Sequence, residues 1–348
     1  MAQRLAFRCF PLLLLSGVGI ASKEGTRMKT FLIASALLFS SLSWAETKET
    51  EHELLLIVGA PGEERFANGF RSAASAWEKA AASTNASITI VGLEASDKVD
   101  RTLIEEWVTN LKNDSTIPAW IVYIGHGTHT QKSTLLNLRG PDLSAVVLCE
   151  WLDPLERTLI FVHGGSASAP FINRLSKPNR ILMTATRSGT ELNYARFGER
   201  FATVISSREG DANQDGQVSL LEAFVSAAQS VEQFYEDEGR LASEHALIDD
   251  NGDSVGTPAD WFRGERLIKQ PEGDTIPDGF RSRQIAFIAS EQERLLTPDQ
   301  RFARDRLEAE LETLRAKKED LDESEYYDGL EKILLELGEI YLLVKNES

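Results

Sequence analysis

Short, continuously apolar segments alternate with segments of helical periodicity along the first two thirds of the chain. Five apolar segments predict buried strands, at residues 53–59, 87–92, 119–125, 158–162 and 180–185. The segments between them carry apolar residues at helical spacing. Strands without polar alternation, joined by helices, predict a mainly parallel sheet covered on both faces, an α/β fold built as a three-layer αβα sandwich. Functional groups in such sheets lie beyond the C-terminal ends of the strands.

The last part of the chain follows a different pattern. After a predicted helix at 218–238, residues 246–283 are rich in Gly, Asp and Pro and predict an ordered loop. Apolar residues at helical spacing then occur on both sides of an acidic break at 318–325. We therefore expect a sandwich domain over 46–285 and a helical hairpin or coiled-coil segment over 290–348. The hairpin either docks on its own domain or forms an arm for a partner or for oligomerisation.

The first 45 residues have the pattern of an export signal. Residues 28–30 are Met-Lys-Thr, residues 31–39 are apolar, and small residues lead to Ala45. We expect 28–45 to be a signal peptide that is cleaved after Ala45, and the protein to be periplasmic or extracellular. Residues 1–27 are interpreted as an upstream extension before the true start, the alternative being one long signal region. No later segment is long and apolar enough to span a membrane.

Composition and charge limit the classes of function that this protein can have. The chain has 348 residues, of which 42% are hydrophobic and 26% charged, as in globular proteins. Residues 1–45 hold five basic residues and one acidic residue, so the exported chain keeps 32 basic and 53 acidic residues, a net charge of −21. That charge argues against a nucleic-acid partner and suits the binding of cations. Only Cys149 remains after cleavage, which excludes an internal disulfide.

Two predicted strand ends carry histidine and glycine. The third strand runs into Gly125-His126-Gly127, and the fourth runs into residues 163–168, His-Gly-Gly-Ser-Ala-Ser. These ends resemble the caspase–legumain group of cysteine peptidases, including bacterial caspase-like proteins. Residues 175–189 and 234–253 extend the resemblance. In that group a histidine at one strand end and a cysteine at the next face the same scissile bond.

The resemblance implies a role for each of these positions. It places His126 at the catalytic histidine, the Gly127 amide at the oxyanion, and Gly165 at the catalytic cysteine. Because glycine has no side chain, we expect a pseudoenzyme whose scaffold binds a peptide or protein. The alternative is an active hydrolase in which His126 serves as base for Ser166 or Ser168. Ser166 is one residue away from the cysteine position, so its side chain points the other way on a strand.

Other residues near the strand ends have weaker chemical interpretations. His126, His129 and His163 together could hold a transition metal, although no fourth ligand is evident. Arg187 is a candidate for binding a substrate carboxylate. Cys149 lies within a predicted helix and is expected to be a small buried hydrophobe rather than a nucleophile.

Residues 211–222 match the spacing of an EF-hand calcium loop. Positions 1, 3, 5, 7 and 12 of the loop are Asp211, Asn213, Asp215, Gln217 and Glu222. Gly216 occupies position 6, where the chain turns sharply, and Ser219 occupies position 9. We expect one Ca²⁺ that staples the fold, the alternative being a calcium-free Asp/Asn/Gly turn. A calcium-dependent interaction module is a third possible function.

A second acidic cluster lies at residues 249–253, Asp-Asp-Asn-Gly-Asp. We expect this cluster to be a solvated turn, the alternative being a second cation site.

Overall fold

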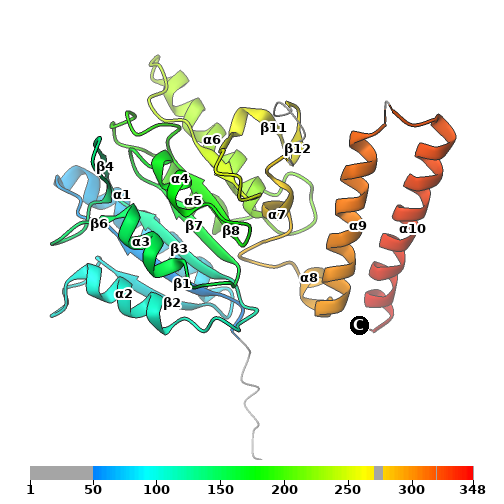
Figure 1. The fold of residues 1–348 in the computed structure, drawn as a ribbon, viewed down its shortest axis with the longest axis horizontal. Helices are drawn as coiled ribbons and strands as arrows, with labels where there is room; N and C mark the ends of the chain where they lie inside the picture. Colours follow the sequence, from blue (N-terminus) through cyan, green and yellow to red (C-terminus); the bar gives the residue numbers. More distant parts are fainter. Residues whose placement is uncertain (1–49, 270–276, 319, 348) are drawn as a thin grey trace, which may run out of the picture. The chain divides into compact units, whose positions relative to one another are not determined.

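The main sheet of the protein has seven strands in the order β10-β9-β8-β7-β3-β1-β2. Figure 1 labels five of them, β8, β7, β3, β1 and β2. The structure is a computed structural model that describes residues 50–269, 277–318 and 320–347, so the predicted signal and upstream segments lie outside the described residues. The parallel strands are β1 (Glu53–Val58), β2 (Ser87–Val91), β3 (Ala119–Ile124), β7 (Leu159–His163) and β8 (Arg180–Thr184). At one edge, β9 (Leu247–Asp249) and β10 (Thr257–Pro258) run antiparallel.

Two helical layers cover the faces of the sheet. One layer contains α1 (Glu64–Ala82), α5 (Phe197–Ile205) and α6 (Leu220–Asp237), and the other contains α2 (Asp100–Asn110), α3 (Ala145–Leu152) and α4 (Ile172–Leu175). Successive residues of β1 alternate between the layers: Leu54 packs with Trp77 of α1, whereas Leu55 packs with Ile104 of α2. Both faces of the strands are buried, as their uninterrupted apolar sequence predicts. The predicted three-layer αβα sandwich is confirmed.

Several short strands and one short helix are added to this sandwich. A three-stranded antiparallel sheet of β4 (Gly127–His129), β5 (Thr134–Leu136) and β6 (Leu143–Ser144) follows directly on the end of β3. Within the predicted loop 246–283, the structure has β9, β10, the hairpin of β11 (Phe262–Arg263) and β12 (Arg266–Leu267), and helix α7 (Phe280–Arg283). The sequence predicts an ordered loop there and misses these elements, because strands of two or three residues leave no periodic signal.

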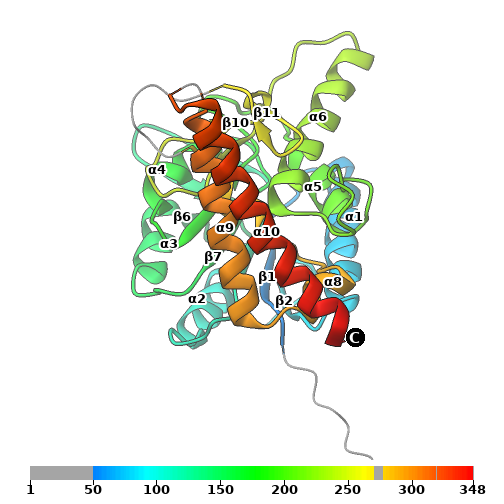
Figure 2. The ribbon, with the colours of Figure 1, turned by 90° about the vertical axis from the view of Figure 1, so that its right-hand side faces the viewer.

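The C-terminal helices are present. Helix α8 (Glu291–Leu295) leads into α9 (Pro298–Ala316) and α10 (Glu323–Glu347), which lie side by side in both views (Figures 1 and 2). Their shared apolar core consists of Leu296, Leu307, Leu311, Ile333 and Ile340. Polar contacts join the pair to the sandwich: Arg283 pairs with Glu312 at 3.2 Å, and Gln284 donates to the Asp305 carbonyl at 3.2 Å. Among the described residues, no helix is both long and apolar enough to cross a bilayer.

Candidate functional site

The ends of β3 and β7 lie next to each other, as the sequence predicts. The two strands pair in parallel, with Tyr123 opposite His163 at their last register position. The Tyr123 hydroxyl donates to the carbonyl of His126 at 2.5 Å and fixes the turn that follows β3. The two segments of interest are therefore neighbours at the edge where a parallel sheet places its functional groups.

The His126 ring is directed toward helix α1 rather than toward the end of β7. Its ring centroid lies 4.9 Å from that of Phe66 and 5.4 Å from that of Phe70 on α1, and 5.8 Å from that of Tyr194. Its Nε2 lies 3.2 Å from the Pro61 carbonyl, so the neutral ring carries its proton on Nε2 and donates it there. Desolvation by burial lowers the pKa of His126, with the Pro61 carbonyl partly opposing the shift.

Gly165 occupies a place where no other residue fits. A β-carbon built on Gly165 would lie 2.1 Å from the carbonyl oxygen of Gly125 and 3.0 Å from its carbon. Both obstructing atoms belong to the backbone and cannot rotate away. The Gly165 N–H donates to His163 Nδ1 at 3.1 Å, which fixes the segment further. The position implied for the nucleophilic cysteine is closed to any side chain in this conformation.

The two nearby serines are held in other hydrogen bonds. Ser166 is 2% exposed, and its hydroxyl accepts from the Gly127 N–H and donates to the Gly127 carbonyl, both at 3.2 Å. Ser168 is fully buried, and its hydroxyl lies 3.0 Å from Thr186 Oγ1 and accepts from the Thr186 N–H. No hydrogen bond joins either serine to His126 in the described part of the chain. The Ser–His pair that the active-hydrolase interpretation needs does not form.

The segment after β7 has a strained backbone and is hydrogen-bonded to a residue that follows β8. Ala167 has φ of +52°, in the left-handed region that residues other than glycine rarely adopt. Its N–H donates to the Glu191 carbonyl at 2.9 Å. The Glu191 carboxylate in turn contacts His245 Nδ1 at 2.6 Å and Arg187 Nε at 3.3 Å. Arg187 therefore faces a carboxylate of its own chain, which weakens its interpretation as a substrate-binding residue.

The remaining histidines and the cysteine have separate structural contacts. His163 is fully buried beside Phe171, and desolvation lowers its pKa to about 3. His129 Nδ1 lies 2.7 Å from Thr134 Oγ1. The three histidines contact separate partners and do not converge, so they do not form a metal site. Across the described ranges, no group of three His, Cys, Asp or Glu side chains is gathered as metal ligands in this conformation, the acidic loops included, so cation binding there requires side chains to rearrange. Cys149 is half-buried, and its thiol donates to the Arg174 carbonyl at 3.0 Å.

The predicted calcium loop has a turn closed by its own acceptors. Asp211 accepts from the N–H groups of Asp215 and Gly216, at 3.2 and 3.0 Å. Gly216 has φ of +88°, which explains glycine at position 6. Ser219 caps α6 and forms a capping box with Glu222. The local sequence thus builds a tight turn that leads directly into a helix, as a calcium loop requires.

The side-chain oxygens of this loop suit a hard cation such as Ca²⁺. Asp211, Asn213, Asp215 and Glu222 supply oxygen only, and the Gln217 carbonyl is available at position 7. In this conformation Glu222 Oε1 accepts from the N–H groups at positions 2 and 3 of the loop, at 2.9 and 3.1 Å. Ligation through that oxygen requires the carboxylate to exchange those bonds for the cation.

Sequence reasoning missed Glu265, which lies beside this loop. Its carboxylate accepts from Asn213 Nδ2 and from Ser219 Oγ, each at 3.0 Å. Burial raises the pKa of Glu265, and the charge of Glu222 adds to the rise. Glu265 lies on the tight turn between β11 and β12, far from the loop in sequence, so no local motif could point to it.

Comparison with known proteins yields structural likenesses only. No protein-family profile matches the chain, and no curated protein matches it. Among solved structures it is similar to the initiator caspase Dronc of Drosophila, at 13% identity and a TM-score of 0.33, covering 58% of this chain and 80% of that one. It is also similar to Raptor of Chaetomium thermophilum, at 11% identity and a TM-score of 0.32, covering 47% of this chain and 18% of that one. Both TM-scores are below 0.5, so the fold class rests on the sheet itself and neither likeness bears on activity.

Proposed function

We propose that this protein is an exported caspase-like scaffold that binds a peptide or protein and has no peptidase activity. The observation that carries the proposal is the closed position at Gly165, where any β-carbon would lie only 2.1 Å from the Gly125 carbonyl oxygen. The hydrogen bonds of Ser166 and Ser168 support it, because they remove both replacement nucleophiles from the reach of His126. A nucleophile needs a base at hydrogen-bond distance, and no residue that the structure describes serves as one for either serine.

Hydrolysis of a mixed peptide library tests this proposal. We expect no cleavage by the purified chain in the presence of calcium, and none by a His126→Ala variant. Cleavage that disappears in His126→Ala contradicts the proposal. Cleavage that persists in the variant points to a contaminating peptidase, which repurification removes.

We further propose that the scaffold is stabilised by Ca²⁺ in the loop 211–222. The loop supports this role because it connects segments that are distant in sequence. Gln217 Oε1 accepts from the Ser290 N–H at 3.1 Å, next to α8, and Asn213 reaches Glu265 on the β11–β12 turn. A cation that orders the loop therefore also orders the start of the C-terminal helices.

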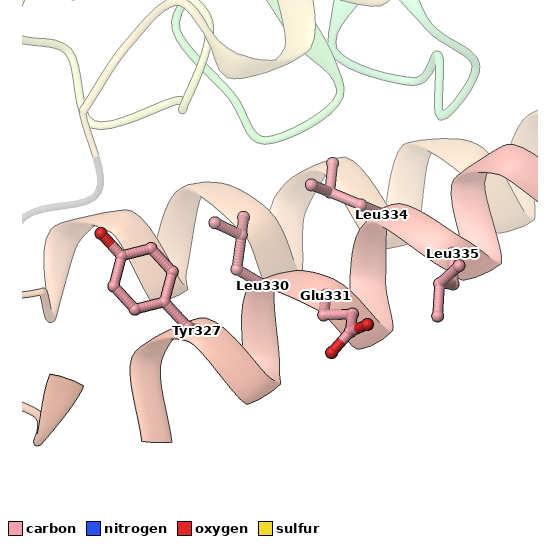
Figure 3. Close-up of a pocket in the computed structure, with 5 residues that line it drawn as sticks. All are labelled: Tyr327, Leu330, Glu331, Leu334 and Leu335. Carbon is pink, nitrogen blue, oxygen red and sulfur yellow. The ribbon is translucent and has the colours of Figure 1, made fainter. Parts of the chain in front are cut away.

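The outer face of α10 is the surface that we propose for self-association. Tyr327, Leu334 and Leu335 are about half exposed or more, and they line a shallow surface pocket with Leu330 and Glu331 (Figure 3). Tyr327, Leu334 and Tyr341 recur every seven residues, the spacing by which one helix packs along another. A second copy of α10 presents the same stripe, so a two-fold pairing covers both.

A further inference from the structure

Residues 249–255, expected from the sequence to be a solvated turn, repeat the hydrogen bonds of residues 211–217. We number both loops from their first aspartate. In each loop the asparagine at position 3 accepts from the N–H of position 5, at 2.9 Å for Asn213 and 2.8 Å for Asn251. Its Nδ2 donates to the carboxylate at position 5, at 3.3 Å for Asp215 and 3.2 Å for Asp253. That carboxylate accepts from the N–H of position 7, at 3.0 and 2.7 Å.

The backbone of the two loops also agrees. Positions 4 and 6 have positive φ in both: +63° at Gln214 and +88° at Gly216, against +80° at Gly252 and +67° at Ser254. Residues other than glycine adopt this region rarely. The cluster at 249–253 thus shares these hydrogen bonds and positive φ angles with the calcium-type loop. The loops differ at position 1, where Asp249 accepts from the N–H of position 4 and Asp211 accepts from those of positions 5 and 6.

Asp278 takes the place that Glu222 has in the first loop. Glu222 Oε1 accepts from the N–H groups of positions 2 and 3, and Asp278 Oδ1 accepts from the same two positions of the second loop, at 2.8 and 3.2 Å. The other oxygen of each carboxylate accepts from a donor at position 9. The Ser219 N–H donates to Glu222 Oε2, and the Thr257 hydroxyl donates to Asp278 Oδ2. Asp260, which stands at position 12 by sequence, pairs with Lys269 instead.

An unpartnered buried oxygen points to a ligand in the second loop. Asp249 is 1% exposed, and its Oδ2 has no hydrogen-bond partner among the described residues. Its Oδ1 accepts from the Gly252 N–H at 2.9 Å, so the carboxylate faces the loop. Burial raises the pKa of Asp249 and the charge of Asp253 adds to the rise, while the nearby Ser176 hydroxyl and backbone N–H groups partly oppose it.

The surroundings of Asp249 are rich in buried negative charge. Asp250 and Asp278 are 1% and 4% exposed, and burial raises the pKa of Asp278. Arg281 is the cation whose charge acts on Asp249 and Asp250, and its Nη1 donates to the backbone carbonyls of Arg180 and Asp250. A bound divalent cation offsets this charge more directly, because it contacts the carboxylate oxygens.

We propose that residues 249–255 together with Asp278 form a second divalent-cation site of the calcium class. The ligands are Asp249 Oδ2, side-chain oxygens of Asn251 and Asp253, the Val255 carbonyl and the Asp278 carboxylate. All are oxygens, the ligand type that Ca²⁺ takes in proteins. The site lies at the end of β9, and Ser254 N donates to Ser176 Oγ at 3.0 Å, so the cation ties the edge of the sheet to the segment before β8.

Equilibrium dialysis with radioactive Ca²⁺ on the full, chelator-treated chain tests the site. We expect two bound Ca²⁺ per chain for the wild type and one for Asp253→Asn. The asparagine keeps the acceptor for the N–H of position 7, so the turn is preserved while one charged ligand is lost. Asp278→Asn is likewise expected to bind one. Asp260→Asn is the matched control, an exposed acid in the following turn, and is expected to bind two.

The variant Asp215→Asn separates this site from the first loop. It is expected to bind one Ca²⁺, and Asp215→Asn combined with Asp253→Asn none. If Asp253→Asn and Asp278→Asn bind as much as the wild type, the second site is overturned, whatever the first loop does. If Asp215→Asn binds as much as the wild type while Asp253→Asn loses one, the first loop fails and the second site stands. Melting each variant in chelator confirms that it is folded.

Discussion

Replacing Gly165 with alanine is expected to destabilise the protein strongly. The added methyl would lie 2.1 Å from the Gly125 carbonyl oxygen, whereas carbon and carbonyl oxygen in close contact are about 3.3–3.6 Å apart. The ends of β3 and β7 must therefore separate by about 1 Å or more. That separation also strains both hydrogen bonds between Ser166 and Gly127.

The size of the effect follows from these two contributions. Overpacking of a tight site costs about 1–3 kcal/mol. Two weakened hydrogen bonds add about 1–3 kcal/mol. We expect a loss of about 2–6 kcal/mol in the free energy of unfolding, a large part of the stability of a typical domain. Chemical denaturation in the presence of calcium, followed by tryptophan fluorescence, measures it.

A second glycine gives the matched control. Nothing lies within 4 Å of a β-carbon built on Gly338, in the interior of α10. Gly338→Ala is expected to stabilise by about 0.5–1 kcal/mol, because alanine favours the helix. Gly165→Cys should be as destabilised as Gly165→Ala and should not cleave peptides. A Gly165→Ala variant within 0.5 kcal/mol of the wild type, or a His126-dependent peptidase activity in Gly165→Cys, refutes the reasoning.

The remaining predictions concern calcium, pH and self-association. Calcium at about 100 times its dissociation constant stabilises the folded chain by about 2.7 kcal/mol per site, which raises the melting temperature by roughly 5–10 °C. In thermal melts, Glu222→Gln should lose the part of this calcium-dependent rise that comes from the first loop. A rise as large as that of the wild type contradicts the prediction. The pKa of about 3 for His163 means that below pH 6.5 the unfolded chain binds a proton that the folded chain does not. The contribution of His163 is therefore complete above pH 6.5 and falls by about 1.4 kcal/mol per pH unit toward pH 3. The slope of stability against pH should be smaller in His163→Asn than in the wild type by this amount, while the slope from His52, whose pKa burial lowers to about 4, stays in both; equal slopes count against the reasoning. Leu334→Ser combined with Leu335→Ser should shift sedimentation toward the monomer, whereas Leu241→Ser, an exposed apolar control, should not; a wild type that is already monomeric rules out self-association.

Local periodicity was enough to predict the sandwich, but not the contacts at its edge. The five buried strands carry their pattern in consecutive residues, so their existence, their positions along the chain and their parallel arrangement could be predicted. Gly165 was singled out from the sequence, yet its closure depends on Gly125, forty positions earlier, whose carbonyl no local pattern places. From the sequence, His163 was a candidate metal ligand. In the structure its Nδ1 accepts a hydrogen bond from the Gly165 N–H instead. The edge strands β9 and β10 have three and two residues, too few for any period to show.

The two acidic loops explain how the segment before the C-terminal helices is held. At one end, Asp250 caps α7 by accepting from the N–H groups of Gly279 and Ser282. At the other end, Gln217 accepts from the Ser290 N–H. Between them, the N–H of Leu220, at position 10 of the first loop, donates to the Ile285 carbonyl. Each end of the segment 278–290 is therefore attached to a loop that we propose to bind a cation, so calcium acts on the attachment of the helical hairpin as well as on the sandwich. In this arrangement the ends of β3 and β7 are packed closely together, whereas the two loops that we propose to bind cations lie later in the chain, at residues 211–222 and 249–255.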